Sequence, residues 1–284
     1  MFFRTEVLIP KPSFSLRPLQ RMLFVGSCFA DNIGRRFEEE KFRAVVNPYG
    51  VMYNPVSILH TVGRYVDENR DSLAAARPEG ESGREIPLVA VFTLGTNHVY
   101  RLKETGEIVD NCQKRPQRLF QEEELTIDQC RDALAEAVDK LRGIVPGVQV
   151  IITVSPIRYA KYGFHGSQLS KATLLLAADR LCREYGCCSY FPAYEIVNDE
   201  LRDYRFYKED MLHPSDQAVA YIWERFSAAY FSKETNAFLE KWRPIKAALN
   251  HRPFNPDSEE HQIFMQRTQE KIEELKRQYP ELEF

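Results

Sequence analysis

The hydrophobic positions of this chain form short apolar runs that alternate with segments of helical period. The first run, residues 22–25, has no helical period and predicts a buried strand. Beyond it, Phe29, Ile33 and Phe37 recur every four residues with charged side chains on the other faces, which predicts an amphipathic helix over about residues 29–41. Gly26 stands between the two patterns and indicates a sharp turn from strand to helix.

Four further apolar runs predict strands, and apolar stripes at helical spacing separate them. The predicted strands cover residues 42–46, 88–94, 148–154 and 187–191. The predicted helices begin near the capping residues Asn54, Thr126, Ser170 and Ser215. A polar segment at 103–118 includes a predicted hairpin around Thr105 and Gly106. This alternation favours one α/β domain whose five parallel strands run in the order 2-1-3-4-5, with helices on both faces.

The composition of the chain changes towards its two ends. Residues 1–20 contain three prolines without a clear period, and we expect an extended N-terminal arm there. Residues 21–232 hold all five predicted strands, and with 44% apolar residues in a chain of 284 they can bury a sizeable core. Residues 233–284 contain apolar positions at helical spacing but no strand candidate. We expect them to form a helical extension outside the α/β domain.

Charge and cysteine content exclude several classes of function. The net charge is −3, which gives no electrostatic reason to expect nucleic acid or an anionic membrane as a partner. No apolar run reaches eighteen residues, and the first residues lack the features of a secretory signal, so we expect a cytoplasmic protein. The six cysteines form no CxxC pair, which argues against a zinc site and against a disulfide framework.

Two adjacent side chains follow the first predicted strand at the beginning of a helix. Ser27 and Cys28 lie where open α/β sheets bind ligands, and where the free N–H groups of a helix favour developing negative charge. Both are therefore candidate nucleophiles. The competing interpretation makes Ser27 a helix cap and Cys28 a small buried side chain under the turn.

Three other segments carry candidate catalytic groups. Asp210 and His213 are three residues apart in a loop, a spacing that permits the carboxylate to hold the imidazole while it acts as a base. The Asn97 amide and the Gly50 N–H follow other strands and are candidate oxyanion donors. The alternatives are a solvated acidic loop before a helix, an ordinary turn asparagine and an ordinary turn glycine.

The order of these segments resembles that of the SGNH, or GDSL-like, hydrolases, whose four sequence blocks supply Ser, Gly, Asn and His. The run at residues 26–30, Gly-Ser-Cys-Phe-Ala, is the name-giving motif of the GSCFA family, which looks like a branch of that superfamily. Other segments similar to this family lie at residues 47–50, 54–55, 111–112, 154–158, 169–172 and 210–214. The resemblance covers about residues 21–232.

This resemblance implies a flavodoxin-like three-layer α/β/α sandwich that cleaves an ester or transfers an acyl group. In the implied mechanism Ser27 attacks the carbonyl, His213 is the base and Asp210 orients it. The backbone N–H groups of Ser27 and Gly50 and the amide of Asn97 then stabilise the oxyanion. An acylated small molecule, in particular an acetylated carbohydrate, is the expected substrate, and neither a metal nor another cofactor is needed.

The sequence departs from the superfamily pattern at two places. The usual Gly-Asp-Ser start reads Gly-Ser-Cys here, so Ser27 and Cys28 can each be aligned with the nucleophile; we expect Ser27 to attack and Cys28 to be structural. The acid that usually follows the asparagine is replaced by His98. His98 and His165 are expected to line the substrate cleft, or else to be turn and surface-loop residues.

The main alternative to an enzyme is a non-catalytic ligand-binding module with the same fold, since a fold does not determine a function. An acyltransferase is the alternative within the same chemistry. A nucleotide-binding domain is disfavoured, because no G-x-G-x-x-G follows the first strand and no Walker-type lysine is present. The sequence leaves the oligomeric state open.

Overall fold

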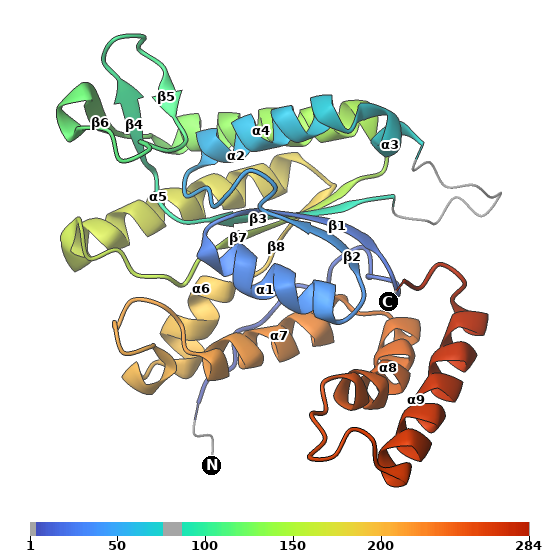
Figure 1. Cartoon of the computed structure of the whole chain (residues 1–284). Coiled ribbons are helices and arrows are strands. Elements are labelled where there is room, and N and C mark those ends of the chain that lie inside the picture. Colours follow the sequence, from blue (N-terminus) through green and yellow to red (C-terminus); the bar gives the residue numbers. More distant parts are fainter. Residues whose placement is uncertain (1–3, 76–86, 284) are drawn as a thin grey trace.

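The central sheet of the protein has five parallel strands in the predicted order, β2-β1-β3-β7-β8 (Figure 1). The computed structural model describes residues 4–75 and 87–283. The strands of this sheet are β1 Arg21–Gly26, β2 Arg43–Val46, β3 Val89–Leu94, β7 Gln149–Val154 and β8 Cys188–Tyr190. Every residue of β3 is buried, as expected for a central strand covered by helices on both faces.

Helices cover both faces of this sheet and complete the predicted three-layer sandwich (Figure 1). They are α1 Cys28–Glu39, α2 Pro55–Glu68, α3 Arg70–Ala74, α4 Ile127–Ile144, α5 Gly163–Glu184, α6 Ala193–Glu195 and α7 Asp216–Tyr230. Apolar side chains of α2, α4 and α5 share one core with one face of the sheet. Those of α1 and α7 share a second core with the other face. The predicted fold class is therefore confirmed.

The predicted helix starts agree with the structure at three of the four capping residues. Thr126 forms a full capping box, because its hydroxyl accepts from the Gln129 N–H and the Gln129 side chain accepts from the Thr126 N–H. Asn54 and Ser215 cap α2 and α7 through their side-chain oxygens. Because these hydrogen bonds join residues within one turn, the starts of these helices could be predicted from the sequence.

The prediction that Ser170 caps a helix was wrong. The helix α5 begins at Gly163, and Ser170 lies inside it, buried, where its hydroxyl accepts a hydrogen bond of 3.0 Å from the Asn97 N–H. The first turns of α5 expose the apolar side chains of Phe164 and Leu169, so the apolar stripe that marks a buried helix face begins only later.

A second, smaller sheet lies beside α2 and α4, outside the sandwich (Figure 1). Its three antiparallel strands are β4 His98–Leu102, β5 Ile108–Val109 and β6 Phe120–Glu124. The short helix η1 Gln117–Leu119 lies between β5 and β6 and leads directly into β6. The predicted hairpin around Gly106 joins β4 to β5. The sequence did not indicate β6, because three consecutive glutamates and only one buried apolar residue give it no strand pattern.

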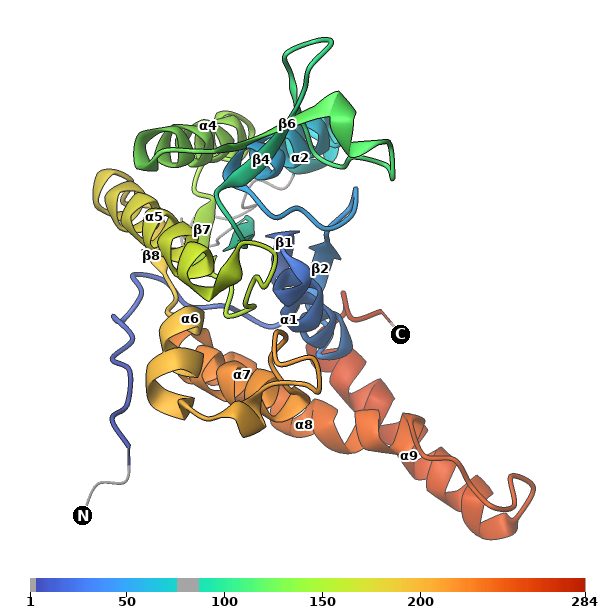
Figure 2. The same cartoon turned by 90° about the vertical axis from the view of Figure 1, so that its left-hand side faces the viewer.

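The chain ends in two helices, α8 Lys233–Leu249 and α9 Glu259–Gln278, that project from the sandwich (Figure 2). Their apolar residues pack against each other in a third, separate core. The indole Nε1 of Trp242 donates a hydrogen bond of 3.0 Å to the carbonyl of Glu39 at the end of α1. The helical character agrees with the sequence, and the independence of residues 21–232 from this extension stays a prediction.

The described part of the N-terminal arm, residues 4–20, runs along the sandwich and joins it through Leu16. The Leu16 N–H donates to the carbonyl of Tyr230 at 2.7 Å, and its side chain is fully buried. Residues 1–3 of the arm and residue 284 of the extension lie outside the described residues. Within the described ranges, none of the helices has the length and apolar character needed to cross a membrane.

Candidate active site

Gly26 ends β1 and turns the backbone into α1 at the carboxyl edge of the sheet. Its φ of +147° is rarely adopted by residues with a side chain, and a Cβ there would lie 2.2 Å from the carbonyl oxygen of Thr93. Its N–H donates to the Asn47 side chain at 2.9 Å. The close approach of β1 to β3 therefore fixes the direction in which the next two side chains leave the turn.

Ser27 is fully buried and caps α1. Its N–H donates to the backbone and side-chain oxygens of Thr93, at 3.1 and 2.9 Å. Its hydroxyl accepts from the Phe29 N–H at 3.3 Å and lies 3.2 Å from Thr93 Oγ1. Within the described residues these contacts account for the Ser27 side chain, and none of them is with His213. The structure therefore does not bring this expected nucleophile to the expected base.

Cys28, the first residue of α1, occupies the position expected for Ser27. Its side chain is partly exposed, and its Sγ lies 4.0 Å from Nε2 of His213 and 3.7 Å from the hydroxyl of Tyr53. Successive side chains on a helix point about 100° apart, so only one of the two neighbours can face the histidine. The arrangement is the reverse of the expected one, because the capping position draws the serine hydroxyl inward.

The predicted contact between Asp210 and His213 is present in the structure. Nδ1 of His213 lies 2.6 Å from Asp210 Oδ2, while Oδ1 accepts the N–H groups of Leu212 and His213 at 2.8 and 2.9 Å. These hydrogen bonds lower the pKa of Asp210 to about 2. The carboxylate is thus ionised at neutral pH and holds the proton on Nδ1, so Nε2 faces the Cys28 sulfur as an acceptor.

Two hydrogen-bond donors lie next to the Cys28 sulfur. The Cys28 N–H, in the first turn of α1, has no acceptor among residues 4–75 and 87–283, as is usual at a helix start. Burial raises the pKa of Tyr53 to about 12, so its hydroxyl stays protonated and can donate at neutral pH. No motif in the sequence singles out Tyr53; its only signal is its position between the turn glycine and the Asn54 helix cap.

The two residues predicted as oxyanion donors are already engaged in the fold. The Gly50 N–H donates to the Asn47 carbonyl at 2.8 Å and closes a turn. The Asn97 side chain is 2% exposed, and its Nδ2 donates to the Leu125 carbonyl at 2.8 Å. Both groups therefore hold loops at this edge of the sheet. No contact described for either of them involves Cys28, so their role as oxyanion donors stays a prediction.

The two predicted cleft histidines differ in their surroundings. His98 begins β4, and its ring stacks on that of Tyr162 at 3.6 Å; burial lowers its pKa, so it is neutral at physiological pH. His165 is exposed in the first turn of α5. No contact described for either residue involves Cys28 or His213, so their role in a cleft stays a prediction.

Lys171 of α5 is fully buried near the ends of β3 and β7. Its ammonium donates to the carbonyls of Gly95 and Ser155, at 2.7 and 2.8 Å, and so joins the ends of β3 and β7. Burial lowers its pKa to about 7. The rings of Tyr159 and Tyr194 lie 5.5 and 6.0 Å from Nζ. No role for Lys171 was predicted from the sequence, although this residue falls on the apolar stripe of α5.

This lysine is connected to the segments that carry Cys28 and His213 through backbone hydrogen bonds. The Gly95 N–H donates to the Tyr53 carbonyl at 2.8 Å, and Tyr53 contacts Cys28. The segment after Ser155 reaches the His213 loop through the Arg158 N–H, which donates to the Leu212 carbonyl at 3.0 Å. The described part of the chain contains no group of three or more His, Cys, Asp or Glu side chains that is placed to hold a metal ion.

Solved structures similar to this chain include several esterases. A catalytic mutant of Axe2, an acetylxylan esterase from Geobacillus stearothermophilus, is 12% identical with a TM-score of 0.45, over 77% of this chain and 98% of the other. A carbohydrate esterase of family 3 from Talaromyces cellulolyticus is 10% identical with a TM-score of 0.38, over 74% and 95%. LAE5, an alpha/beta hydrolase enzyme from the metagenome of Lake Arreo in Spain, is 14% identical with a TM-score of 0.43, over 78% and 98%.

The sequence comparisons identify the family more directly. No curated protein matches the chain. A model described as the GSCFA family matches residues 21–79 and 85–226, and a model described as the GSCFA domain protein, C-terminal domain, matches residues 242–284. The first model alone covers more than half of the sequence and includes every residue of the Cys28, His213 and Asp210 arrangement. The chain belongs to the GSCFA family.

Proposed function

We propose that this protein cleaves or transfers acyl esters with Cys28 as its nucleophile, His213 as the general base and Asp210 as the residue that orients the base. The observation that carries this proposal is the continuous arrangement of sulfur, imidazole and carboxylate at the carboxyl edge of the sheet. The Sγ–Nε2 distance of 4.0 Å is longer than a hydrogen bond, as is common in catalytic pairs without substrate. Ser27, the nucleophile expected from the sequence, becomes a structural cap in this proposal.

The reaction proceeds through an acyl thioester. Sγ of Cys28 attacks the carbonyl carbon, its proton passes to Nε2 of His213, and the carbonyl electron pair moves to the oxygen. The intermediate collapses and expels the alcohol, which takes the proton back from His213. Water or an acceptor hydroxyl, deprotonated by His213, then attacks the thioester, and departure of the thiolate with that proton restores Cys28.

Two features favour the charged species in this reaction. The position of Cys28 at the start of α1 exposes the thiolate to the positive end of the helix dipole, which stabilises negative charge. The Cys28 N–H and the Tyr53 hydroxyl are the donors that we assign to the oxyanion. Each donor of this kind is worth about 3 kcal/mol of barrier in other enzymes. Acetylated carbohydrate remains the expected substrate class, from the resemblance to SGNH hydrolases.

A trapping experiment tests this proposal. The full chain is mixed with 4-nitrophenyl acetate, quenched in acid and analysed by mass spectrometry. We expect one acetyl group on the peptide that contains Cys28, and a burst of nitrophenolate of one equivalent per chain. Cys28→Ala should lower kcat by a factor on the order of 10⁴ or more, while Cys112→Ala, which removes another partly exposed thiol, should not.

Two outcomes would overturn the proposal. Acetylation of Ser27 with full activity in Cys28→Ala would restore the serine as nucleophile. An absence of both burst and turnover with a series of short acyl esters and acetylated sugars would favour the non-catalytic binding module. Partition of the thioester between water and added alcohols separates a hydrolase from an acyltransferase, because a transferase yields the new ester in excess of free acid.

A further inference from the structure

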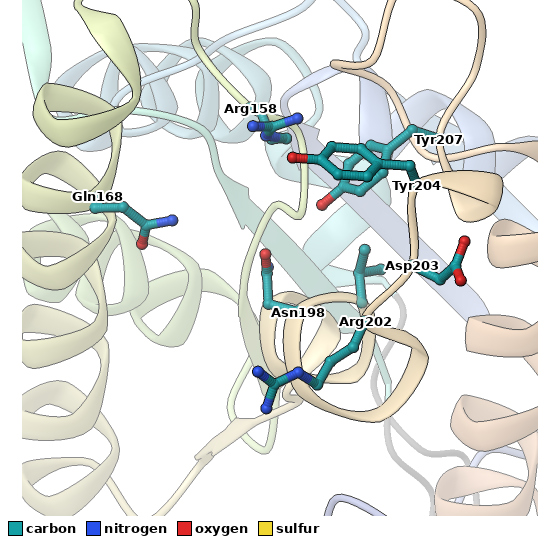
Figure 3. Close-up of a pocket in the computed structure, with 8 residues that line it drawn as sticks. Arg158, Gln168, Asn198, Arg202, Asp203, Tyr204 and Tyr207 are labelled. Carbon is teal, nitrogen blue, oxygen red and sulfur yellow. The ribbon is translucent and has the colours of Figure 1, made fainter. Parts of the chain in front are cut away.

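A pocket of about 250 Å³ lies between segments that are far apart in the sequence (Figure 3). Its walls come from the segment after β7, from the start of α5, and from two short helices, η2 Ile196–Leu201 and η3 Tyr204–Phe206. The lining residues are Arg158, Gln168, Val197, Asn198, Arg202, Asp203, Tyr204 and Tyr207. The volume lies below the range of about 300–1,000 Å³ typical of drug-sized ligands, which suits a single sugar ring.

Arg158 provides the first positive charge of this pocket. One of its terminal nitrogens donates to the Met211 carbonyl at 2.9 Å, which leaves its other N–H groups available. Its guanidinium lies 4.0 Å from the centre of the Phe164 ring and 5.8 and 5.4 Å from the rings of Tyr204 and Tyr207. No described carboxylate forms an ion pair with it. The aromatic rings therefore orient this guanidinium without neutralising it.

Arg202 provides a second positive charge on another wall (Figure 3). Its guanidinium forms neither an ion pair nor a hydrogen bond with any other described residue. The acidic side chain of the pocket, Asp203, instead binds Arg205, through a hydrogen bond of 3.0 Å to the guanidinium and one of 2.9 Å to the backbone N–H. In Figure 3 the Asp203 carboxylate points away from Arg158. The pocket thus holds two guanidinium groups without an acidic partner.

Two amide side chains complete the pocket and supply one hydrogen-bond donor and one hydrogen-bond acceptor. Gln168 reaches in from α5, and its oxygen accepts the Tyr194 hydroxyl at 2.5 Å, so its NH₂ group remains free to donate. The Asn198 NH₂ group donates to the Tyr194 carbonyl at 2.8 Å, so its oxygen remains free to accept. A ligand with both an anionic group and hydroxyl groups matches this combination of donors and acceptor.

The pocket is attached to the proposed catalytic loop by hydrogen bonds on both sides. Arg158 binds Leu212 and Met211, which directly precede His213. On the other side, the Lys208 N–H donates to the His213 carbonyl at 2.7 Å, one residue after the Tyr207 that lines the pocket. A group held in the pocket therefore lies next to the loop that presents the imidazole.

We propose that this pocket binds the carboxylate-bearing sugar of an acylated acidic carbohydrate, a hexuronate, and so selects the alcohol part of the ester; this rests on the proposed acyl-ester chemistry. A guanidinium matches the two oxygens of a carboxylate with parallel hydrogen bonds. The exposed ring of Tyr204, which lines the pocket, offers apolar surface to the C–H groups of the sugar ring. The amides of Gln168 and Asn198 then bind the ring hydroxyls.

Equilibrium binding to the full chain tests the pocket without any reaction. Titration calorimetry with glucuronate, glucose and glucose 6-phosphate should give measurable binding of glucuronate and at least tenfold weaker binding of glucose. Arg202→Gln should weaken glucuronate binding at least tenfold, because this exposed side chain has no structural partner to lose. Arg180→Gln is the matched control, since this exposed arginine pairs with Asp128 away from the pocket; it should leave binding unchanged.

Equal binding of glucose and glucuronate, or unchanged glucuronate binding in Arg202→Gln, would overturn the proposal that this pocket binds a hexuronate. Tighter binding of glucose 6-phosphate than of glucuronate would overturn the carboxylate assignment. With an O-acetylated methyl glucuronoside and its neutral glucoside, KM should be at least tenfold lower for the acidic ester, and Arg202→Gln should abolish this preference. Glucuronate binding without ester turnover would support the hexuronate pocket and refute the proposed function. Turnover that depends on Cys28 but shows no preference for the acidic ester would support the proposed function and refute the hexuronate pocket.

Discussion

Replacing Lys171 by methionine tests how a fully buried ammonium affects the stability of this fold. Burial lowers its pKa from 10.5 to about 7, so between these values the folded chain binds fewer protons than the unfolded chain. Each pKa unit corresponds to about 1.4 kcal/mol, which makes the charged form cost the fold about 5 kcal/mol relative to the neutral amine. Because the unfolded chain binds more protons in this range, the wild-type free energy of unfolding rises with pH above about 7, by about 3 kcal/mol between about pH 6 and pH 9.

The variant removes this titration and also removes two hydrogen bonds. The carbonyls of Gly95 and Ser155 lose their shared donor, at a cost of about 1–3 kcal/mol each. At about pH 9 the wild-type amine is neutral and still donates to both, so the variant is clearly less stable. At about pH 6 the difference in free energy of unfolding between wild type and variant narrows. The wild type then carries a buried charge that destabilises its fold, and the variant does not.

Urea unfolding of the full chain at several pH values, followed by circular dichroism, measures this difference. The quantity that matters is the gap in free energy of unfolding between wild type and Lys171→Met, because it cancels the titration of all other groups. Lys140→Met is the control, since this exposed lysine pairs with Glu136 on the surface of α4. A gap that stays constant from about pH 6 to pH 9 would refute the reasoning and show that the ammonium remains charged in the fold.

Three further predictions concern Ser27, the proposed catalytic residue Asp210 and the domain boundary. Ser27→Ala should lower the free energy of unfolding by about 1 kcal/mol through loss of the helix cap, and it should retain ester turnover; an inactive but folded variant would contradict its structural role. Asp210→Asn should lower kcat/KM by a factor on the order of 10³–10⁴, because His213 loses the ionised partner that sets its tautomer, and an unchanged rate would exclude this role. A chain truncated after Ser232 should keep the circular dichroism of the sandwich, and a wholly unfolded product would place the extension within the core.

The order of strands and helices was predictable because each central strand is a continuous apolar run bounded by turn residues. The helix starts at Asn54, Thr126 and Ser215 were predictable for a similar reason, since a cap bonds to residues within the same turn. The start of α5 at Gly163 was not predictable, because no local signal marks it. The first turn of this helix has no side-chain cap and exposes Phe164.

The site was predictable only where its contacts are local. Asp210 and His213 lie three residues apart, so their spacing alone indicated a contact. The directions of Ser27 and Cys28 depend on Thr93, which lies on a different strand far along the chain. The commitment of Asn97 to the Leu125 carbonyl is likewise a tertiary contact, and no pattern of residues reveals it.

The turn at Gly26 has a consequence for the genetics of this protein. The atom nearest to an added Cβ is the carbonyl oxygen of Thr93, which belongs to the backbone and is present whatever residue stands at position 93. A clash with a side chain can be relieved by a smaller residue elsewhere, but a clash with a main-chain atom cannot. A selection for suppressors of Gly26→Ala should therefore return reversions to glycine and no substitutions at position 93.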